Sequence, residues 1–313
     1  MTLEETLNLY GSKKEPFFFC ISFDMTKWEV HNLKDLPKDI KYEINDNLEK
    51  STKKSLLEKT PVSKIDYKDK FLKIQNEIEN GNTYLTNLTS QTKIKTKLSL
   101  LELFENSNAK FKLYFRDKFI CFSPERFIKC KDNQISTYPM KGTIDASIPN
   151  AQEKILEDIK EKAEHTMVVD LLRNDLSIVS SNVQVKKFRY CETIDAGDKE
   201  LLQVSSEITG DLENDWQKNI GTIITSILPA GSISGTPKKQ TLKIIDKIEE
   251  YDRDFFTGIF GIFDGQTLDS AVMIRFIEQN NNKNLIYKSG GGITSDSNID
   301  NEYNEMIDKV YIP

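Results

Sequence analysis

Large apolar side chains recur along the chain with two spacings, which predict helices and strands respectively. Residues 17–23 form a nearly continuous apolar run, typical of a buried strand. From residue 67, apolar side chains recur every three or four positions, which predicts a helix that ends at Asn80-Gly81. The same spacing over residues 150–175 predicts the longest helix, with Ala163 on its apolar face.

The remaining pattern predicts mostly strands. They are expected at residues 83–89, 110–115, 118–122, 128–131, 134–138, 183–190, 200–210, 256–264, 267–279 and 284–289. Further helices are expected at residues 216–226, 237–251 and from residue 300, and the charged stretch 34–65 as a surface loop or irregular helix. Because strands arrive in runs rather than alternating with helices, we expect an α+β protein with large antiparallel sheets flanked by helices.

Length and composition narrow the class of protein. The 313 residues are enough for one large domain, and we expect a short segment, 1–60, packed on a main domain, 61–313. A net charge of −6 does not suggest a surface that binds nucleic acid. No apolar run approaches the ~18 residues of a membrane span, and the four widely spaced cysteines are typical of reduced thiols. We therefore expect a cytoplasmic protein that binds neither nucleic acid nor membrane.

One lysine carries more chemical information than the others. Lys141 lies in the run Tyr-Pro-Met-Lys-Gly-Thr at residues 138–143, where a tightly held backbone can position an amine nucleophile. By itself the run is weak, because the chain has many lysines and most are solvated. Four other runs accompany it in order: Ser123-Pro124-Glu125-Arg126, residues 163–165 through Arg173-Asn174-Asp175, residues 231–238, and Glu302-x-x-Glu305.

Together these runs resemble the chorismate-utilising enzymes, the family of anthranilate, aminodeoxychorismate and isochorismate synthases. The resemblance covers roughly residues 60–313 and implies the chorismate-binding fold of that family. Lysine in the Pro-x-Lys-Gly-Thr position is similar to the aminodeoxychorismate-forming branch, whereas anthranilate-forming members usually have alanine there.

The resemblance implies a reaction in para-aminobenzoate and folate biosynthesis. Chorismate and ammonia would give 4-amino-4-deoxychorismate, with ammonia supplied by a glutamine amidotransferase partner subunit. Lys141 would form a covalent intermediate with the ring, which requires a lowered amine pKa or a nearby base. Glu125 would be the general acid that protonates the departing hydroxyl, which requires a raised pKa. From the residues alone, a surface ion pair between Glu125 and Arg126 is equally open.

Two pairs of glutamates suggest a metal site. Glu161 and Glu164 share one face of a predicted helix, as do Glu302 and Glu305. Either pair alone is most simply a solvated pair on a helix surface. The resemblance implies that both pairs line a Mg²⁺ site, with Glu164 and Glu305 contacting the ion directly and the other two acting through water.

A further group is implied in binding the substrate. Arg275 lies among apolar residues of a predicted strand, where a cation is costly without an anionic partner. Free amides at the start of the helix after residue 237 attract anions. For Lys309, a solvated position on the last helix is nearly as plausible as a substrate-side position. The implied substrate-binding residues are Thr143, Gly235, Thr236, Arg275, Gly291, Gly292 and Lys309.

Three positions depart from the family pattern. Leu85 stands where isochorismate- and salicylate-forming members have a water-activating lysine, and Gln203 where a histidine is common. Phe256 replaces a common tyrosine. Two alternatives therefore stay open: an anthranilate synthase component I, and a non-catalytic subunit that binds chorismate or metal.

Overall fold

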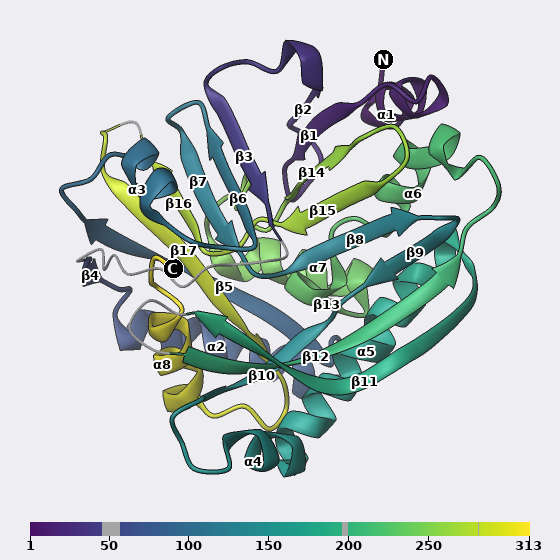
Figure 1. The fold of residues 1–313 in the computed structure, drawn as a ribbon. Helices are drawn as coiled ribbons and strands as arrows, with labels where there is room; N and C mark the ends of the chain where they lie inside the picture. The colour runs from purple at the N-terminus through teal and green to yellow at the C-terminus, as the bar shows by residue number, and fades with distance from the viewer. Residues whose placement is uncertain (46–56, 196–199, 281) are drawn as a thin grey trace.

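The computed structural model describes residues 1–45, 57–195, 200–280 and 282–313, which form two large antiparallel sheets (Figure 1). Within this part of the chain, sheet A has nine strands in the order β10-β12-β9-β8-β15-β14-β1-β2, with β11 paired to β12. Sheet B has eight described strands in the order β13-β5-β17-β16-β7-β6-β3, with β4 paired to β5. The predicted α+β class with antiparallel sheets and flanking helices is confirmed.

The element bounds are as follows. Sheet A contains β1 (Phe17–Ile21), β2 (Trp28–Asn32), β8 (Arg126–Lys131), β9 (Gln134–Thr137), β10 (Met140–Asp145), β11 (Ser181–Asp195), β12 (Glu200–Asp211), β14 (Ile259–Phe263) and β15 (Leu268–Val272). Sheet B contains β3 (Ile40–Ile44), β4 (Glu58–Thr60), β5 (Leu85–Lys95), β6 (Phe111–Phe115), β7 (Phe119–Ser123), β13 (Gly235–Thr236), β16 (Phe276–Gln279) and β17 (Leu285–Ile293). The helices are α1 (Leu3–Ser12), α2 (Lys64–Glu79), α3 (Leu100–Asn106), α4 (Ala151–Glu157), α5 (Ile159–Val179), α6 (Ile220–Ile227), α7 (Lys238–Glu249) and α8 (Ile299–Asp308), with short 3₁₀ turns η1 (Leu33–Asp35), η2 (Trp216–Asn219) and η3 (Gly231–Ile233).

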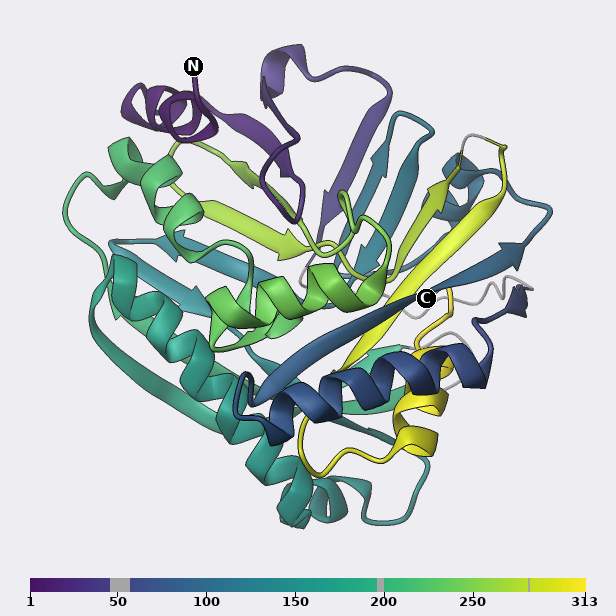
Figure 2. The ribbon, with the colours of Figure 1, turned by 180° about the vertical axis from the view of Figure 1, so that it is seen from behind.

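The helices α2, α5, α6 and α7 lie together on one side of the sheets (Figure 2). Helix α5 turns Val168, Leu172 and Leu176 into the largest apolar cluster, which also takes in β1, β8, β14 and α6. A second cluster joins α2, α7 and α8 over β5 and β17. Burial of these apolar faces is the main stabilising contribution, at roughly 25 cal/mol per Å² of apolar surface.

Several sequence predictions need correction. The predicted helix over 150–175 is two helices, because Asp158 leaves helical conformation and its side chain caps α5 by accepting from the Glu161 N–H. Ala163 is exposed rather than on the apolar face. The predicted loop 34–65 contains β3 and β4, and its residues 46–56 lie outside the described part of the chain.

The predicted strand 267–279 is also divided, and the division builds the site. Strand β15 belongs to sheet A and β16 to sheet B, so the chain changes sheet between them. It changes sheet again between β7 and β8, at Pro124-Glu125. The two crossings lie side by side, because the Val272 N–H donates to Glu125 O at 3.2 Å and the Phe122 N–H to Arg275 O at 3.2 Å. Glu125 and Arg275 therefore meet at the seam of the two sheets.

The amino-terminal residues contribute to both sheets. Strand β1 pairs with β14 and β2 in sheet A, and β3 pairs with β6 in sheet B. The side chain of Thr2 caps α1 in a capping box with Glu5, which fixes where that helix starts. No helix in the described ranges is long and apolar enough to cross a membrane.

Candidate active site

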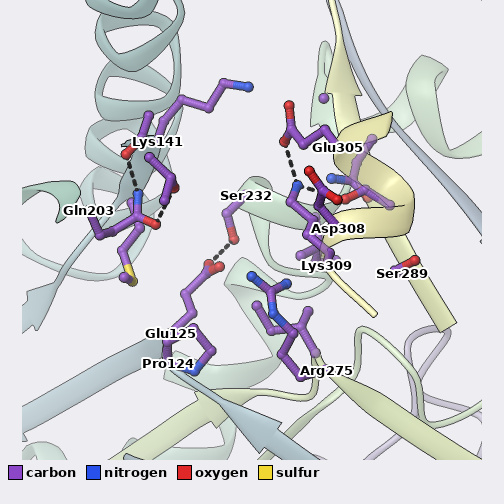
Figure 3. A pocket seen from close by; sticks show the side chains of 18 of the residues that line it. Pro124, Glu125, Lys141, Gln203, Ser232, Arg275, Ser289, Glu305, Asp308 and Lys309 are labelled. Atoms are coloured by element: carbon purple, nitrogen blue, oxygen red, sulfur yellow. Dashed lines mark hydrogen bonds and ion pairs between the residues drawn. The ribbon is translucent and has the colours of Figure 1, made fainter. Parts of the chain in front are cut away.

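A cavity of about 700 Å³ opens at the seam of the two sheets. Lys141 lies on one side of it, Glu305 and Lys309 face it from the other, and Glu125 and Arg275 lie below them in Figure 3. The predicted site residues among its lining are Glu125, Lys141, Thr143, Glu161, Gly235, Arg275, Gly292, Glu305 and Lys309. Four others, Glu164, Glu302, Thr236 and Gly291, lie outside this lining, and the two glutamates are buried.

Lys141 lies in an irregular part of β10 that the neighbouring elements hold in place. The pairing of β10 with β12 changes register between Met140 and Thr143, and Gly142 takes a φ of 93°, which favours glycine. Gln203 donates to Gly142 O at 2.8 Å and accepts from the Thr143 hydroxyl at 2.8 Å. His165 Nδ1 lies 3.1 Å from Lys141 O. The backbone of the lysine is thus fixed from both α5 and β12.

The amine of Lys141 is surrounded by carboxylates. Its Nζ lies 2.8 Å from Glu164 Oε2. Burial would lower the pKa of Lys141, but Glu305, Glu164 and Glu161 outweigh burial and raise it above its usual value. The lowered Lys141 pKa that a covalent role could rest on is therefore not found in the protein alone. The alternative requirement, a base near the amine, is met by Glu164.

The four glutamates suit a hard divalent cation. Glu161 Oε2, Glu164 Oε1 and Glu302 Oε2 are buried without a hydrogen-bond partner among the described residues. A side chain at Gly291 would come within 3.5 Å of Glu302 Oε2 and 3.7 Å of Glu305 Oε1, so glycine keeps this space open. Mg²⁺ prefers oxygen ligands, and these three buried oxygens have no hydrogen bond to a described residue to give up on binding it.

Three of the four glutamate carboxylates have shifted pKa values. Burial raises the pKa of Glu161 and of Glu302 above the usual glutamate range, as expected for crowded acids. Glu305 is the exception, because Lys309, 2.6 Å away, lowers its pKa to about 2. In the described part of the chain, no three acidic or metal-binding side chains converge closely enough to hold an ion as they stand. Binding would therefore require small side-chain movements.

Lys309 is the carboxyl-terminal cap of α8 rather than a solvated helix lysine. Its Nζ donates to Gly290 O at 2.8 Å and faces the cavity. This placement agrees with a substrate-side position.

Glu125 faces the cavity and makes no surface ion pair with Arg126. Arg126 instead binds Asp269 with two contacts, 2.7 and 3.0 Å long, inside sheet A. The Ser232 hydroxyl donates to Glu125 Oε1. Burial raises the pKa of Glu125, against smaller lowering effects of Ser232, Arg275 and Lys309. A raised pKa suits a carboxyl that must donate a proton.

Arg275 is the cavity's arginine, although it lies at the sheet crossing and not within a strand. Its φ is 53°, an uncommon value for a non-glycine residue, and its guanidinium lies 5.3 Å from the Tyr311 ring centre. Its Nε is buried and makes no hydrogen bond to any described residue. A guanidinium that borders a cavity in this way suits a carboxylate ligand.

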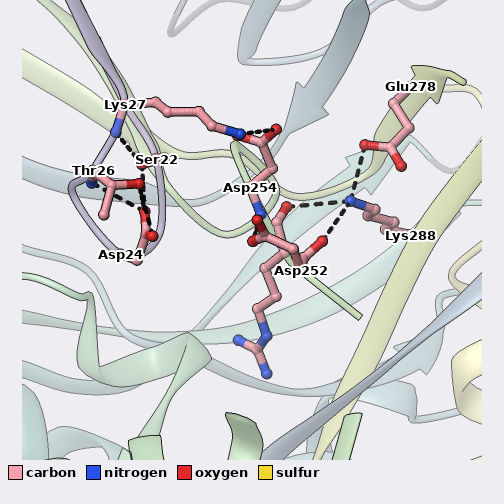
Figure 4. Close-up of polar contacts among 9 residues, drawn as sticks. Ser22, Asp24, Thr26, Lys27, Asp252, Asp254, Glu278 and Lys288 are labelled. Carbon is pink, nitrogen blue, oxygen red and sulfur yellow. Dashed lines mark hydrogen bonds and ion pairs between the residues drawn. The ribbon is translucent and has the colours of Figure 1, made fainter. Parts of the chain in front are cut away.

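Lys288 also borders the cavity, but its charge is satisfied within the protein (Figure 4). Its Nζ lies 2.9 Å from Glu278 Oε2 and donates to the carbonyls of Asp252 and Arg253 at 3.3 and 3.2 Å. We therefore assign Lys288 a structural role.

The three departures from the family pattern all border the cavity. Leu85 lies against Gly292, where an added side chain would meet Leu85 Cδ1 at 3.0 Å, and it has no group that could activate water. Phe256 is buried against Phe276, with ring centres 5.8 Å apart. Gln203 holds the Lys141 strand, a role that the sequence did not indicate. Nor did the sequence indicate Ser232 as the partner of Glu125, although it lies in the 231–238 run.

Comparisons with known proteins agree with this geometry. The sequence profile of the family described as chorismate binding enzyme matches residues 18–312. An uncharacterized PabA-like protein of Pasteurella multocida is 47% identical, over 98% of this chain and 96% of that protein. Aminodeoxychorismate synthase component 1 of Escherichia coli is 31% identical, over 78% of this chain and 56% of its own length. Anthranilate synthase component I from Streptococcus pneumoniae has a solved structure with a TM-score of 0.68 and 26% identity, covering 83% of this chain and 60% of that one.

Two large antiparallel sheets thus meet at a cavity lined by lysine, arginine and carboxylate side chains. The chain belongs to the chorismate binding enzyme family. The match begins at residue 18, so it extends further toward the amino terminus than the motifs alone indicated.

Proposed function

We propose that this protein converts chorismate and ammonia to 4-amino-4-deoxychorismate, a precursor of para-aminobenzoate and folate. The observation that carries this proposal is Lys141, whose side chain lines the same cavity as Glu125 and Arg275 and extends toward Glu305. A partner glutamine amidotransferase would supply the ammonia. The resemblance to an aminodeoxychorismate synthase component 1 and to a PabA-like protein supports such a partner.

The residues divide the reaction into two balanced steps. In the first, the neutral amine of Lys141 adds to C2 of chorismate, both conjugated ring double bonds shift by one position, and the C4 hydroxyl leaves as water after protonation by Glu125. In the second, ammonia adds at C4, both double bonds shift back, the Lys141 amine is expelled, and the proton lost by the new C4 ammonium restores the acid form of Glu125. Chorismate and ammonia thus give aminodeoxychorismate and water.

The other cavity residues bind and orient the substrate. Arg275 and Lys309 supply cationic groups for the two substrate carboxylates, with Thr143 and the backbone at Gly235 and Gly292 bordering the ring. Mg²⁺ held by Glu161, Glu164, Glu302 and Glu305 would neutralise the charge that now raises the Lys141 pKa and would bind a substrate carboxylate.

The product identifies the branch of the family. Incubated with chorismate, Mg²⁺ and an ammonium salt, the protein should form 4-amino-4-deoxychorismate, which liquid chromatography with mass spectrometry separates from anthranilate. Without ammonia, isochorismate and salicylate should not accumulate, because Leu85 cannot activate water. Anthranilate as the main product would support the alternative of an anthranilate synthase component I, which the solved structural relative keeps open. Steady isochorismate formation would contradict the proposal, and no product under any condition would indicate a non-catalytic subunit.

Replacing Glu125 with glutamine should lower turnover by ~10²-fold or more, the usual scale for loss of a general acid. In the wild type, burial raises the Glu125 pKa. The acid must be protonated to act, so kcat should fall as pH rises through this raised pKa. Glu125→Gln should lose that basic limb of the pH profile. Glu213→Gln, at an exposed carboxyl, is the matched control. Turnover of Glu125→Gln within a few-fold of wild type would mean that the proton comes from elsewhere.

A further inference from the structure

An ion pair between a buried carboxylate and a partly exposed lysine lies behind Glu125, outside the main cavity. Asp175 on α5 and Lys238 at the start of α7 approach to 2.8 Å between Oδ1 and Nζ. Lys238 also donates to Ile227 O at 3.0 Å. Neither side chain lines the large cavity, so neither contacts a ligand placed there. Of the run Arg173-Asn174-Asp175, only Asp175 is buried, since Arg173 is exposed and pairs with Asp170 on the helix surface.

The ion pair holds the turn that carries Ser232. The backbone of Gly231 lies against the Asp175 carboxylate, since a Cβ at Gly231 would come within 2.8 Å of Asp175 Oδ2. The next residue is Ser232, whose hydroxyl donates to Glu125 Oε1. One small pocket of about 10 Å³ is bordered by Asp175, Ser232 and Glu125, so the three residues lie close to one another.

Stability alone does not account for this arrangement. Removing two opposite charges from water costs several kcal/mol per ion, and apolar replacements of similar size are often as stable. What the pair provides is a fixed position for the Gly231–Ile233 turn, because one carboxylate accepts from the Lys238 amine and packs against the backbone of Gly231.

We propose that Asp175 and Lys238 are positioning residues for Glu125, acting through the Gly231–Ile233 turn and the Ser232 hydroxyl. The role of Glu125 as the acid rests on the proposed function, but the positioning of its carboxyl does not.

The direction in which the Glu125 pKa shifts in Asp175→Asn distinguishes positioning through Ser232 from a direct electrostatic effect. The groups that face Glu125 are Ser232 on η3, Arg275 at the sheet crossing and Lys309 at the end of α8, and each lowers its pKa. Asp175→Asn removes a negative charge and leaves Lys238 unpaired, which by charge alone would lower the pKa of Glu125. If Asp175 instead holds Ser232 in place, its loss weakens the hydrogen bond to Glu125 and the pKa rises.

The experiment is a ¹³C NMR titration of side-chain carboxyls in the full chain without substrate, with the Glu125 signal identified by its loss in Glu125→Gln. We expect Ser232→Ala to raise the Glu125 pKa by about one unit, the scale of a hydrogen bond to a charged group. Asp175→Asn should also raise it, and the double variant should show no increase beyond Ser232→Ala, because both act through one contact. Asp170→Asn, on the exposed face of α5, should leave it unchanged.

A lowered or unchanged Glu125 pKa in Asp175→Asn would overturn the proposal, as would a shift that adds fully to that of Ser232→Ala. If Asp175→Asn does not fold, Asp175→Asn/Lys238→Met removes both charges together, and the same rise is expected without a net change in charge. In turnover assays, Asp175→Asn should lower kcat by about tenfold to a hundredfold at constant KM for chorismate, as for a misplaced catalytic group. Because the titration needs no substrate, it can succeed or fail independently of the product assay.

Discussion

Replacing Glu305 with glutamine is expected to lower Mg²⁺-dependent turnover of chorismate by about a thousandfold or more. A bound divalent ion contributes several kcal/mol of charge stabilisation, and each ~1.4 kcal/mol is tenfold in rate. Glu305 faces the cavity with its carboxylate ionised, since Lys309 lowers its pKa to about 2. Glutamine keeps the size and one oxygen but removes the charge that a hard cation requires. Glu164→Gln should have a comparable effect.

Mg²⁺ affinity, measured by isothermal titration calorimetry in the absence of substrate, tests the same site without any assay of activity. Both variants should bind the ion much more weakly than wild type and should keep the wild-type melting temperature within a few degrees. Asp300→Asn is the matched control, because Asp300 lies on the same helix as Glu305 but its side chain is 59% exposed and pairs with Lys64. Full activity in excess EDTA, or unchanged affinity in Glu305→Gln, would refute the metal site.

The sequence predicted the local elements better than their assembly. The apolar stripe from Tyr67 and the Asn80-Gly81 ending correctly predicted α2, because both signals lie within the helix itself. The first residues of α1 and α3 also carried a signal that was not used, since Thr2 with Glu5 and Ser99 with Glu102 form capping boxes.

The sheet crossings could not be predicted from periodicity. Residues 267–279 read as one strand, because apolar residues continue through Ile274 and Phe276 and no glycine or proline interrupts them. Strand β15 ends at Val272, and Arg275 takes a positive φ just before β16, a conformation for which arginine gives no sequence signal. The chain is instead held there by Phe122, a residue about 150 positions away, through a tertiary hydrogen bond to Arg275 O.

The predicted site residues were recognised by motif, yet their connections came only from the structure. Glu125 and Arg126 are neighbours in sequence but face opposite partners, Ser232 and Asp269, because successive side chains of extended backbone point to opposite sides. Burial and charge around Lys141 likewise depend on glutamates from two distant helices. A sequence can name these residues, but only the fold determines which charges meet.

The covalent role of Lys141 gives the last prediction. Incubated with chorismate and Mg²⁺ but without ammonia, the wild-type protein should accumulate an adduct on Lys141, visible by intact-mass and peptide mass spectrometry. The first step can proceed under these conditions, while the second lacks its nucleophile. Lys141→Ala should lose the adduct and keep substrate binding, because Arg275 and Lys309 remain in the cavity. Lys160→Ala is the matched control, since Lys160 also lies 3.6 Å from Glu164 but is 41% exposed and outside the cavity lining.

Formation of the Lys141 adduct should depend on Mg²⁺. In the protein alone, Glu305, Glu164 and Glu161 raise the pKa of Lys141, so the amine is protonated and cannot attack. The adduct should therefore form with Mg²⁺ and fail to form in EDTA. At fixed Mg²⁺ its rate should pass through a maximum with pH, because it rises as the Lys141 amine loses its proton and falls as Glu125 loses its own. Residual product from Lys141→Ala is compatible with direct addition of ammonia to the ring. An adduct on another lysine, or full aminodeoxychorismate formation by Lys141→Ala, would instead leave Lys141 with only an electrostatic role beside Glu164.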